Sequence, residues 1–232
     1  MTRNARATFN GLNNQSFRTL LRRTFVAIAA CGIVVVVCYF FVDRPVAFFV
    51  HDHKIAKVEE FRWLTEPPPL VQSWSPLVIA ILFIRRSLSP WRQWQYTLLI
   101  ACVSLIVADQ FRESLGDLFG RYWPETWHNN NPSLIGTDAY GFHPFEVGDD
   151  TGSFPSGHAA RIFAFATVFW LEMPRGRWLY AIIAAPMLVA LVAMNYHFVG
   201  DVISGSVLGG IVGAYAVALS SLGRMPLTPP VP

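Results

Sequence analysis

Two histidines in this chain stand in settings where an imidazole could take part in catalysis. His197 is followed four residues later by Asp201, so on a helical turn their side chains share one face. The carboxylate could then accept a hydrogen bond from one ring nitrogen and leave the other free as a nucleophile. His158 ends a Pro-Ser-Gly-His stretch before an apolar segment, where it could donate a proton. The spacing predicts a nucleophilic histidine, an orienting aspartate and an acid histidine.

An anion site is predicted around His158. Ser156 and Gly157 would contribute a hydroxyl and free backbone N–H groups at the positive end of a helix dipole, a setting that favours anions. Arginine makes charge-assisted contacts to phosphate oxygens. Three arginines lie in or next to the segments that carry these residues: Arg112, Arg121 and Arg161. These groups favour phosphoryl transfer without a metal, so we expect no metal and no other cofactor.

The composition indicates a membrane protein. Of the 232 residues, 53% are hydrophobic and 14% are charged, and the mean hydropathy is +0.38. This excludes a disordered, collagenous or disulfide-scaffold chain. The apolar residues form runs near the ~20 residues that a spanning helix needs. The runs are 24–42, 69–84, 94–113, 157–173, 178–195 and 202–221. We therefore predict an all-α integral membrane protein, a bundle of six transmembrane helices.

Arginine clusters predict how the bundle is oriented, because basic residues gather in the cytoplasmic stretches of membrane proteins. They precede the first run and follow the second, fourth and sixth runs: Arg3, Arg6, Arg18, Arg22, Arg23, Arg85, Arg86, Arg92, Arg175, Arg177 and Arg224. Both termini are therefore expected in the cytoplasm, and the two histidines at the external face. The basic residues form no long stripe interleaved with aromatics, so we expect no nucleic-acid partner. No obligate protein partner is indicated either.

The chain is predicted to hold one membrane domain and two flanks. Residues 1–23 form a basic cytoplasmic leader, 24–221 the single six-helix domain and 222–232 a C-terminal tail. Within the domain, residues 43–68 mix aromatic and charged side chains, which predicts an interfacial helix stopped by the prolines that follow. Residues 120–155 are rich in glycine, proline and asparagine, which predicts a large external loop.

The last apolar run has glycine at every fourth position, at Gly205, Gly209 and Gly213. Small residues at this spacing let two helices approach closely. The pattern occurs both inside bundles and on dimer faces, and we predict packing inside the bundle.

The Pro-Ser-Gly-His stretch and the later H-x-x-x-D, in a chain with six apolar runs, resemble the type 2 phosphatidic acid phosphatase (PAP2) superfamily over residues 95–215. The resemblance implies that His197 attacks phosphorus to give a phosphohistidine. It further implies that Asp201 orients this histidine and that His158 protonates the leaving oxygen.

The same resemblance implies a substrate and a location. Ser156 and Gly157 would help to hold the phosphate of a lipid phosphate or pyrophosphate, whose tail would lie between helices. The protein would hydrolyse this lipid at the external, or periplasmic, face of a bacterial inner membrane. Lipid phosphate and membrane lipids are the partners that this predicts.

The sequence departs from the family's signatures, which are K-x6-R-P, P-S-G-H and S-R-x5-H-x3-D. Gly116 and Trp123 stand where the first signature has its lysine and arginine, and Leu191 stands where the third has its arginine. We hypothesise that three other cations rebuild the phosphate clamp: Arg112, Arg121 and Arg161. Alternatively, Arg161 forms a structural ion pair with an acid of the preceding run. The acids spaced for this are Asp109, Glu113 and Asp117.

Two other functions use the same residues. The phosphohistidine could pass its phosphate to a second lipid, which would make the protein a lipid phosphotransferase. Alternatively, the altered signatures could belong to a non-catalytic relative that binds a lipid phosphate. A test for phosphate release distinguishes all three.

Overall fold

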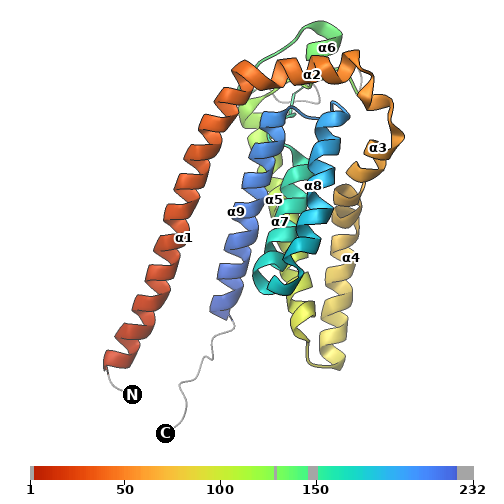
Figure 1. Cartoon of the computed structure of the whole chain (residues 1–232). Coiled ribbons are helices and arrows are strands. Elements are labelled where there is room, and N and C mark those ends of the chain that lie inside the picture. Colours follow the sequence, from red (N-terminus) through yellow and green to blue (C-terminus); the bar gives the residue numbers. More distant parts are fainter. Residues whose placement is uncertain (1–2, 128–129, 146–150, 224–232) are drawn as a thin grey trace.

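The computed structural model describes residues 3–127, 130–145 and 151–223 (Figure 1). Within these ranges the regular structure is helical, and the only β pairing is two isolated bridges, Arg121 with Phe142 and Trp123 with Ser133. The α-helices are α1 (Arg3–Val37), α2 (Asp43–Asp52), α3 (Glu59–Thr65), α4 (Pro67–Leu88), α5 (Gln93–Phe119), α6 (Leu134–Thr137), α7 (Gly157–Glu172), α8 (Arg177–Ala193) and α9 (Val199–Gly223). The other helical turns are the π-helix η1 (Cys38–Val42) and the 3-10 turns η2 (Ile55–Lys57) and η3 (Pro174–Gly176).

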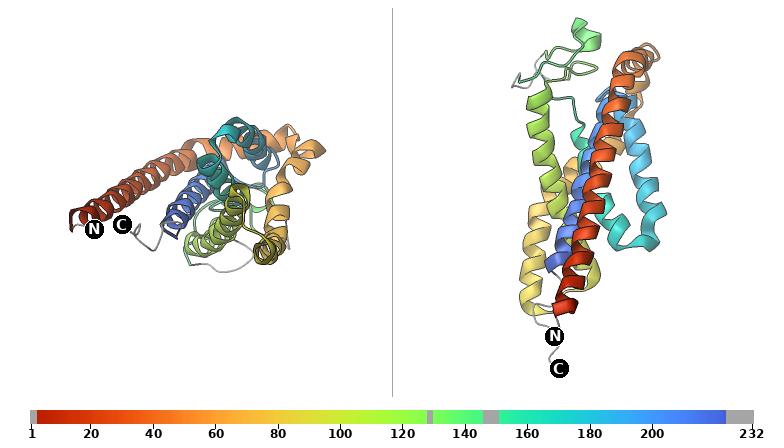
Figure 2. Two further views of the ribbon diagram at one scale, coloured as in Figure 1. Left: turned by 90° about the horizontal axis from the view of Figure 1, so that it is seen from below. Right: turned by 90° about the vertical axis from the view of Figure 1, so that its left-hand side faces the viewer.

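The long helices run lengthwise through the molecule, and α2 and α6 lie across one end of the bundle (Figures 1 and 2). Helix α7 packs against α4, α5, α8 and α9, which places it at the centre. Helix α1 packs against α9 and slants away from the other helices toward its own start. The start of α1 and the end of α9 lie at the same end of the bundle, opposite α2.

Four described stretches are long and apolar enough to cross a membrane: Ser16–Asp52, Glu59–Leu88, Pro174–Ala193 and Val199–Ser221. They correspond to four of the six predicted runs. The other two runs fall on α5 and α7, which do not meet the same criteria. Helix α7 has 16 residues, about 24 Å at the usual rise, which is less than the ~30 Å hydrocarbon core. Helix α5 is longer but carries polar residues at both ends.

The segment 43–68 is not one interfacial helix. It is divided into α2, η2 and α3, and the three prolines predicted to stop it, Pro67, Pro68 and Pro69, begin α4 instead. Proline suits the first turn of a helix because the N–H that it lacks has no intrahelical partner there. The basic leader is continuous with the first long helix, since α1 begins at Arg3. Residues 224–232 of the predicted tail lie outside the described residues.

Helices α7 and α9 are in close backbone contact. A Cβ atom on Gly205 would lie 2.3 Å from the Ser156 carbonyl oxygen, and one on Gly209 would lie 2.2 Å from that of Ala160. The predicted internal packing of this glycine pattern is therefore confirmed. It brings the start of α7, which carries His158, next to the start of α9.

Candidate active site

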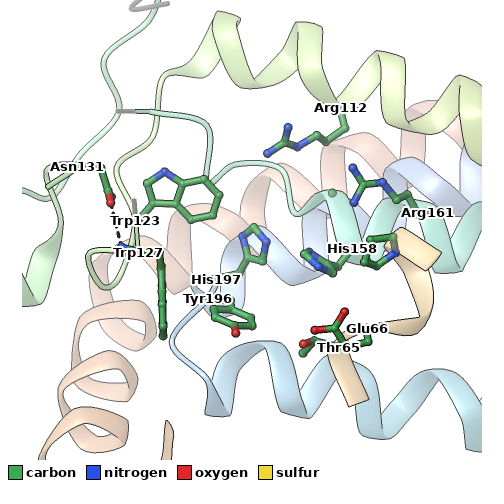
Figure 3. A pocket seen from close by; sticks show the side chains of 12 residues that line it. Thr65, Glu66, Arg112, Trp123, Trp127, Asn131, His158, Arg161, Tyr196 and His197 are labelled. Carbon is green, nitrogen blue, oxygen red and sulfur yellow. Dashed lines mark hydrogen bonds between the residues drawn. The ribbon is translucent and has the colours of Figure 1, made fainter. Parts of the chain in front are cut away.

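A cavity of about 420 Å³ lies at the end of the bundle where α2 crosses (Figure 3). It is bounded by the α3–α4 junction, α5, the loop after α5, the first turns of α7 and the α8–α9 connection. Its lining residues are Thr65, Glu66, Pro69, Arg112, Trp123, Trp127, Asn131, Gly157, His158, Arg161, Tyr196 and His197. The predicted site residues in this set are Arg112, Gly157, His158, Arg161 and His197. The predicted residues outside it are Arg121, Ser156 and Asp201.

The two histidines face one another in the cavity. His197 lies in the α8–α9 connection with only 3% of its surface exposed, and His158 lies in the first turn of α7. Their ring centroids are 6.0 Å apart, and the ring of Trp123 lies 5.3 Å from that of His197. Figure 3 shows Arg112 and Arg161 above these rings, so cations and imidazoles share one space.

The orientation of His197 differs from the prediction. Its Nδ1 lies 3.0 Å from the carbonyl oxygen of Ser153 and 4.0 Å from the nearest carboxylate oxygen of Asp201, which is too long for a hydrogen bond. Because a carbonyl oxygen can only accept, Nδ1 carries the proton and Nε2 keeps its lone pair. Asp201 instead accepts from the Ser153 hydroxyl and from the Phe198 N–H, at 2.9 Å for the latter. It therefore acts on His197 through Ser153.

The surroundings of His197 keep its ring neutral. Burial disfavours the charged form, and the positive charge of Arg112 adds to that effect. Together they hold the pKa of His197 well below its ordinary value, against the opposing effect of the Ser153 hydrogen bond. A neutral imidazole with a free Nε2 is the form that acts as a nucleophile.

Arg112 and Arg161 both line the cavity and are both anchored on one side. Arg112 donates through Nη2 to the Gly152 carbonyl at 2.8 Å, and Arg161 Nη2 lies 2.7 Å from Asp109. Asp109 also accepts from the side-chain amide of Gln72. The predicted structural ion pair of Arg161 is thus present, and Arg161 still reaches the cavity.

Each of these arginines has donors left over. Among the described residues, the Nε atoms of Arg112 and Arg161 are buried without a hydrogen-bond partner. A side chain at Gly157 would come within 3.1 Å of Arg112 Nε, so the glycine makes room for this guanidinium. Two anchored arginines with free N–H groups suit the binding of a phosphate dianion.

Arg121 does not take part in this clamp. Its side chain is fully buried between two carboxylates, with Nη2 2.6 Å from Asp43 and Nη1 2.5 Å from Asp201. Burial lowers the pKa of Arg121, but Asp201 and Asp43 raise it more, so the guanidinium stays charged. It cannot reach the cavity, and the prediction that it binds phosphate is not supported by its position.

Ser156 also has a different role from the predicted one. It is fully buried, and its hydroxyl accepts from the Ala159 N–H at 3.4 Å, which makes it the N-cap of α7. Its own N–H donates to the Asp201 carbonyl at 3.0 Å. Ser156 therefore joins the starts of α7 and α9 and leaves Gly157 to line the cavity.

Several residues at the site carry no signal in the sequence motifs. Ser153 lies in a loop without periodicity, and Glu66 lies within the stretch 43–68 that was predicted to be an interfacial helix. Asp43 had one usable signal, because an acid directly after an apolar run is costly unless it is paired. Among the described residues, no three His, Cys, Asp or Glu side chains form a group that could hold a metal ion.

The sequence pattern of the PAP2 superfamily matches residues 97–223, which is more than half of the chain. The chain belongs to the PAP2 superfamily. The predicted resemblance is thereby confirmed, and this PAP2 chain is an integral membrane protein of the phosphatase type. Its matched region begins within α5, so α1–α4 lie outside it.

Two known proteins resemble this PAP2 chain. The chain is 28% identical over 169 residues to a lipid A 4'-phosphatase of Bacteroides thetaiotaomicron. This match covers 68% of this chain and 70% of the relative. A crystal structure of a transmembrane PAP2-type phosphatidylglycerolphosphate phosphatase from Bacillus subtilis has a TM-score of 0.47 and 14% identity. That match covers 88% of this chain and 98% of the other.

Proposed function

We propose that this PAP2 protein hydrolyses a lipid phosphate through a phosphohistidine on His197. The observation that carries the proposal is the cavity in which Nε2 of His197, the ring of His158 and two anchored arginines meet. The nucleophile is neutral and oriented, a second imidazole lies beside it, and the cations are held in place without substrate.

In the first step, Nε2 of His197 attacks phosphorus and the bond from phosphorus to the lipid oxygen breaks. The leaving oxygen takes a proton from His158, whose protonated form is favoured by the dianionic phosphate next to it. The phosphate oxygens accept hydrogen bonds from Arg112, Arg161 and the N–H groups at the start of α7, which begins at Gly157.

In the second step, water attacks phosphorus, the phosphorus–nitrogen bond breaks and its electron pair returns to His197. His158, now neutral, takes the proton from the water, so both histidines regain their starting states. Inorganic phosphate and the dephosphorylated lipid are the products. We propose that this cycle proceeds without a metal.

The lipid would enter from the side of the bundle. A second cavity of about 290 Å³ is lined only by apolar surface and lies between α4, α5, α7 and α8. It includes Pro67 and Ile162, which neighbour the first cavity's Glu66 and Arg161 along the chain. A tail in this groove would place the head group at His197.

We further propose six spans, with α5 and α7 crossing as the inner helices of the bundle, and both termini in the cytoplasm. The basic clusters at Arg85 and Arg175 lie in the last turn of α4 and in the α7–α8 connection, which are at the ends of these helices away from α2 (Figure 1). By the positive-inside rule, the cavity then opens to the periplasm or the exterior of a bacterial inner membrane. The variant Asp138→Cys, at a side chain that is 85% exposed, should react with an impermeant maleimide in intact cells.

The test is phosphate release from a panel of lipid phosphates by detergent-purified protein in EDTA. Lipid A 4'-phosphate belongs in the panel because the Bacteroides relative is named for it. Wild type should release phosphate, His197→Ala should release none, and His53→Ala, at an exposed histidine outside the cavity, should match wild type. Orthovanadate should inhibit. Equal release by wild type and His197→Ala would overturn the proposal.

Products separate this function from its alternatives. A phosphotransferase would yield a newly phosphorylated lipid in place of free phosphate. A non-catalytic relative would bind the lipid phosphate and release nothing from any member of the panel.

A further inference from the structure

A buried series of hydrogen bonds and ion pairs connects the start of α2 to His197, the proposed nucleophile. Asp43, which is 1% exposed, begins α2 directly after η1 and lies outside the region that matches the family. One of its oxygens accepts from Arg121, at 2.6 Å, and the other accepts from the Gly200 N–H, at 3.0 Å. Arg121 continues the series to Asp201 at 2.5 Å.

The series then reaches the catalytic ring. Asp201 accepts from the Ser153 hydroxyl, and the Ser153 carbonyl accepts from Nδ1 of His197. Every side chain from Asp43 to His197 is at most 3% exposed, so no water screens these charges. Aromatic rings enclose Arg121, with Phe198 at 4.3 Å and Phe142 at 4.8 Å from its guanidinium carbon.

The charges of this cluster do not cancel. Two carboxylates, Asp43 and Asp201, contact the single guanidinium of Arg121, so with both carboxylates ionised the cluster has one net negative charge next to His197. A single carboxylate would have been enough to neutralise the arginine. Burying the second one costs free energy that the arginine alone does not offset, and such a cost is expected where a buried charge serves a function.

We propose that Asp43 is a positioning residue for the reaction at His197, where it fixes Asp201 through Arg121 and supplies the surplus negative charge. This rests on the proposed function, in which attack by Nε2 makes the His197 ring positive. The surplus charge stabilises that ring through Asp201 and Ser153. Neither Asp43 nor Asp201 lines the cavity, so the negative charge does not contact the substrate phosphate.

Other charged groups also face His197, and the test must hold them constant. His158 and Arg161 come from α7, Arg112 comes from α5, and Glu66 comes from the start of α4. Asp43 contacts none of them, so a change at Asp43 alters one charge and leaves the lining of the cavity intact.

The decisive variant is Asp43→Asn, which keeps the size of the side chain and an acceptor for Gly200. We expect kcat to fall about tenfold with KM unchanged, because the loss acts on the charged ring and not on substrate binding. Asp52→Asn is the matched control: it makes the same substitution on the same helix at an exposed position and should leave kcat unchanged. Asp43→Glu restores the charge and should recover part of kcat.

A second readout is independent of turnover. Carbethoxylation of His197 by diethyl pyrocarbonate, followed by mass spectrometry across pH, reports the protonation of its ring. Loss of the surplus charge should move the midpoint for Asp43→Asn to lower pH, and Asp52→Asn should not move it. If the wild-type protein were inactive on every lipid, the proposed function would fail while this shift would still decide the role of Asp43.

A wild-type kcat together with a wild-type modification profile in folded Asp43→Asn would overturn the inference. A fall in thermal stability with both readouts unchanged would do the same, since it would show a purely structural role. If Asp43→Asn does not fold, Asp43→Glu carries the test, and a lower kcat with an unshifted midpoint is then expected, because its charge is retained but displaced. Full activity of Asp43→Glu with a shifted midpoint would contradict the proposal.

Discussion

Arg161 and Arg121 show how the same side chain takes two roles within one site. Arg161 has one carboxylate partner, lines the cavity and has 16% of its side chain exposed. Arg121 has two carboxylate partners and is 0% exposed. Arg161 can still bind an incoming anion. The positive charge of Arg121 is already offset by two carboxylates before any substrate arrives. The number of carboxylates and the access to the cavity therefore distinguish the arginine that we propose to bind phosphate from the one that is held inside the protein.

Replacing Arg121 should have the largest effect. Arg121→Ala leaves Asp43 and Asp201 buried and facing each other without a cation, which costs about 3–5 kcal/mol of stability. Thermal unfolding in detergent measures this loss. Arg44→Ala is the control, because Arg44 is half exposed and lies 3.8 Å from Asp138, and it should change stability by less than about 1 kcal/mol. An unchanged melting temperature for Arg121→Ala would show that Arg121 does not stabilise the two buried carboxylates and would contradict its structural role.

Replacing Arg161 should affect activity more than stability. Arg161→Ala removes a cation from the phosphate and should lower kcat/KM about 100-fold. Asp109 keeps its hydrogen bond to Gln72, so the stability loss should be about 1–2 kcal/mol. Steady-state kinetics and thermal unfolding on the same preparation separate the two effects. Arg177→Ala, at an exposed arginine that begins α8 and does not line the cavity, should leave kcat/KM at the wild-type value.

The sequence predicted those parts of the site that lie on regular helices. Arg112 lies one helical turn before Gly116, which stands at the position of the family's lysine, and it does line the cavity. His158 and Arg161 are one turn apart on α7 in the same way. Helical spacing gives the direction of a side chain, so these residues could be found without a structure.

The residues whose positions the sequence did not reveal lie beyond helix ends. Gly120 has a left-handed conformation with φ of 55° and ends α5, so the direction of Arg121 no longer follows from helical spacing. Asp43 approaches Arg121 from a segment 78 residues away, and only tertiary packing brings the two together. Ser153 orients His197 through a backbone carbonyl, a group that every residue has and no motif can mark.

Crowding the arginine that binds phosphate should have a smaller effect than removing one. Gly157→Ala places a methyl group 3.1 Å from Arg112 Nε, so the guanidinium must move by a few tenths of an ångström. We expect KM to rise about threefold to tenfold with little loss of stability. Gly210→Ala is the control, since its nearest neighbour is Thr167 Oγ1 at 3.9 Å. Equal KM values for the two variants would show that Arg112 does not contact substrate.

The smallest expected effect is a shift of the pH profile. Catalysis needs neutral His197, whose depressed pKa places its loss of activity below pH ~6.5. Arg112→Gln removes a positive charge that disfavours the imidazolium, so the pKa of His197 should rise and the acid limb of kcat/KM should move up by about half a pH unit. Titration of the substrate phosphate is common to both proteins and cancels in the difference. A shift in the opposite direction would mean that Arg112 does not act electrostatically on His197. Arg161 would then be the cavity arginine to compare with the buried Arg121.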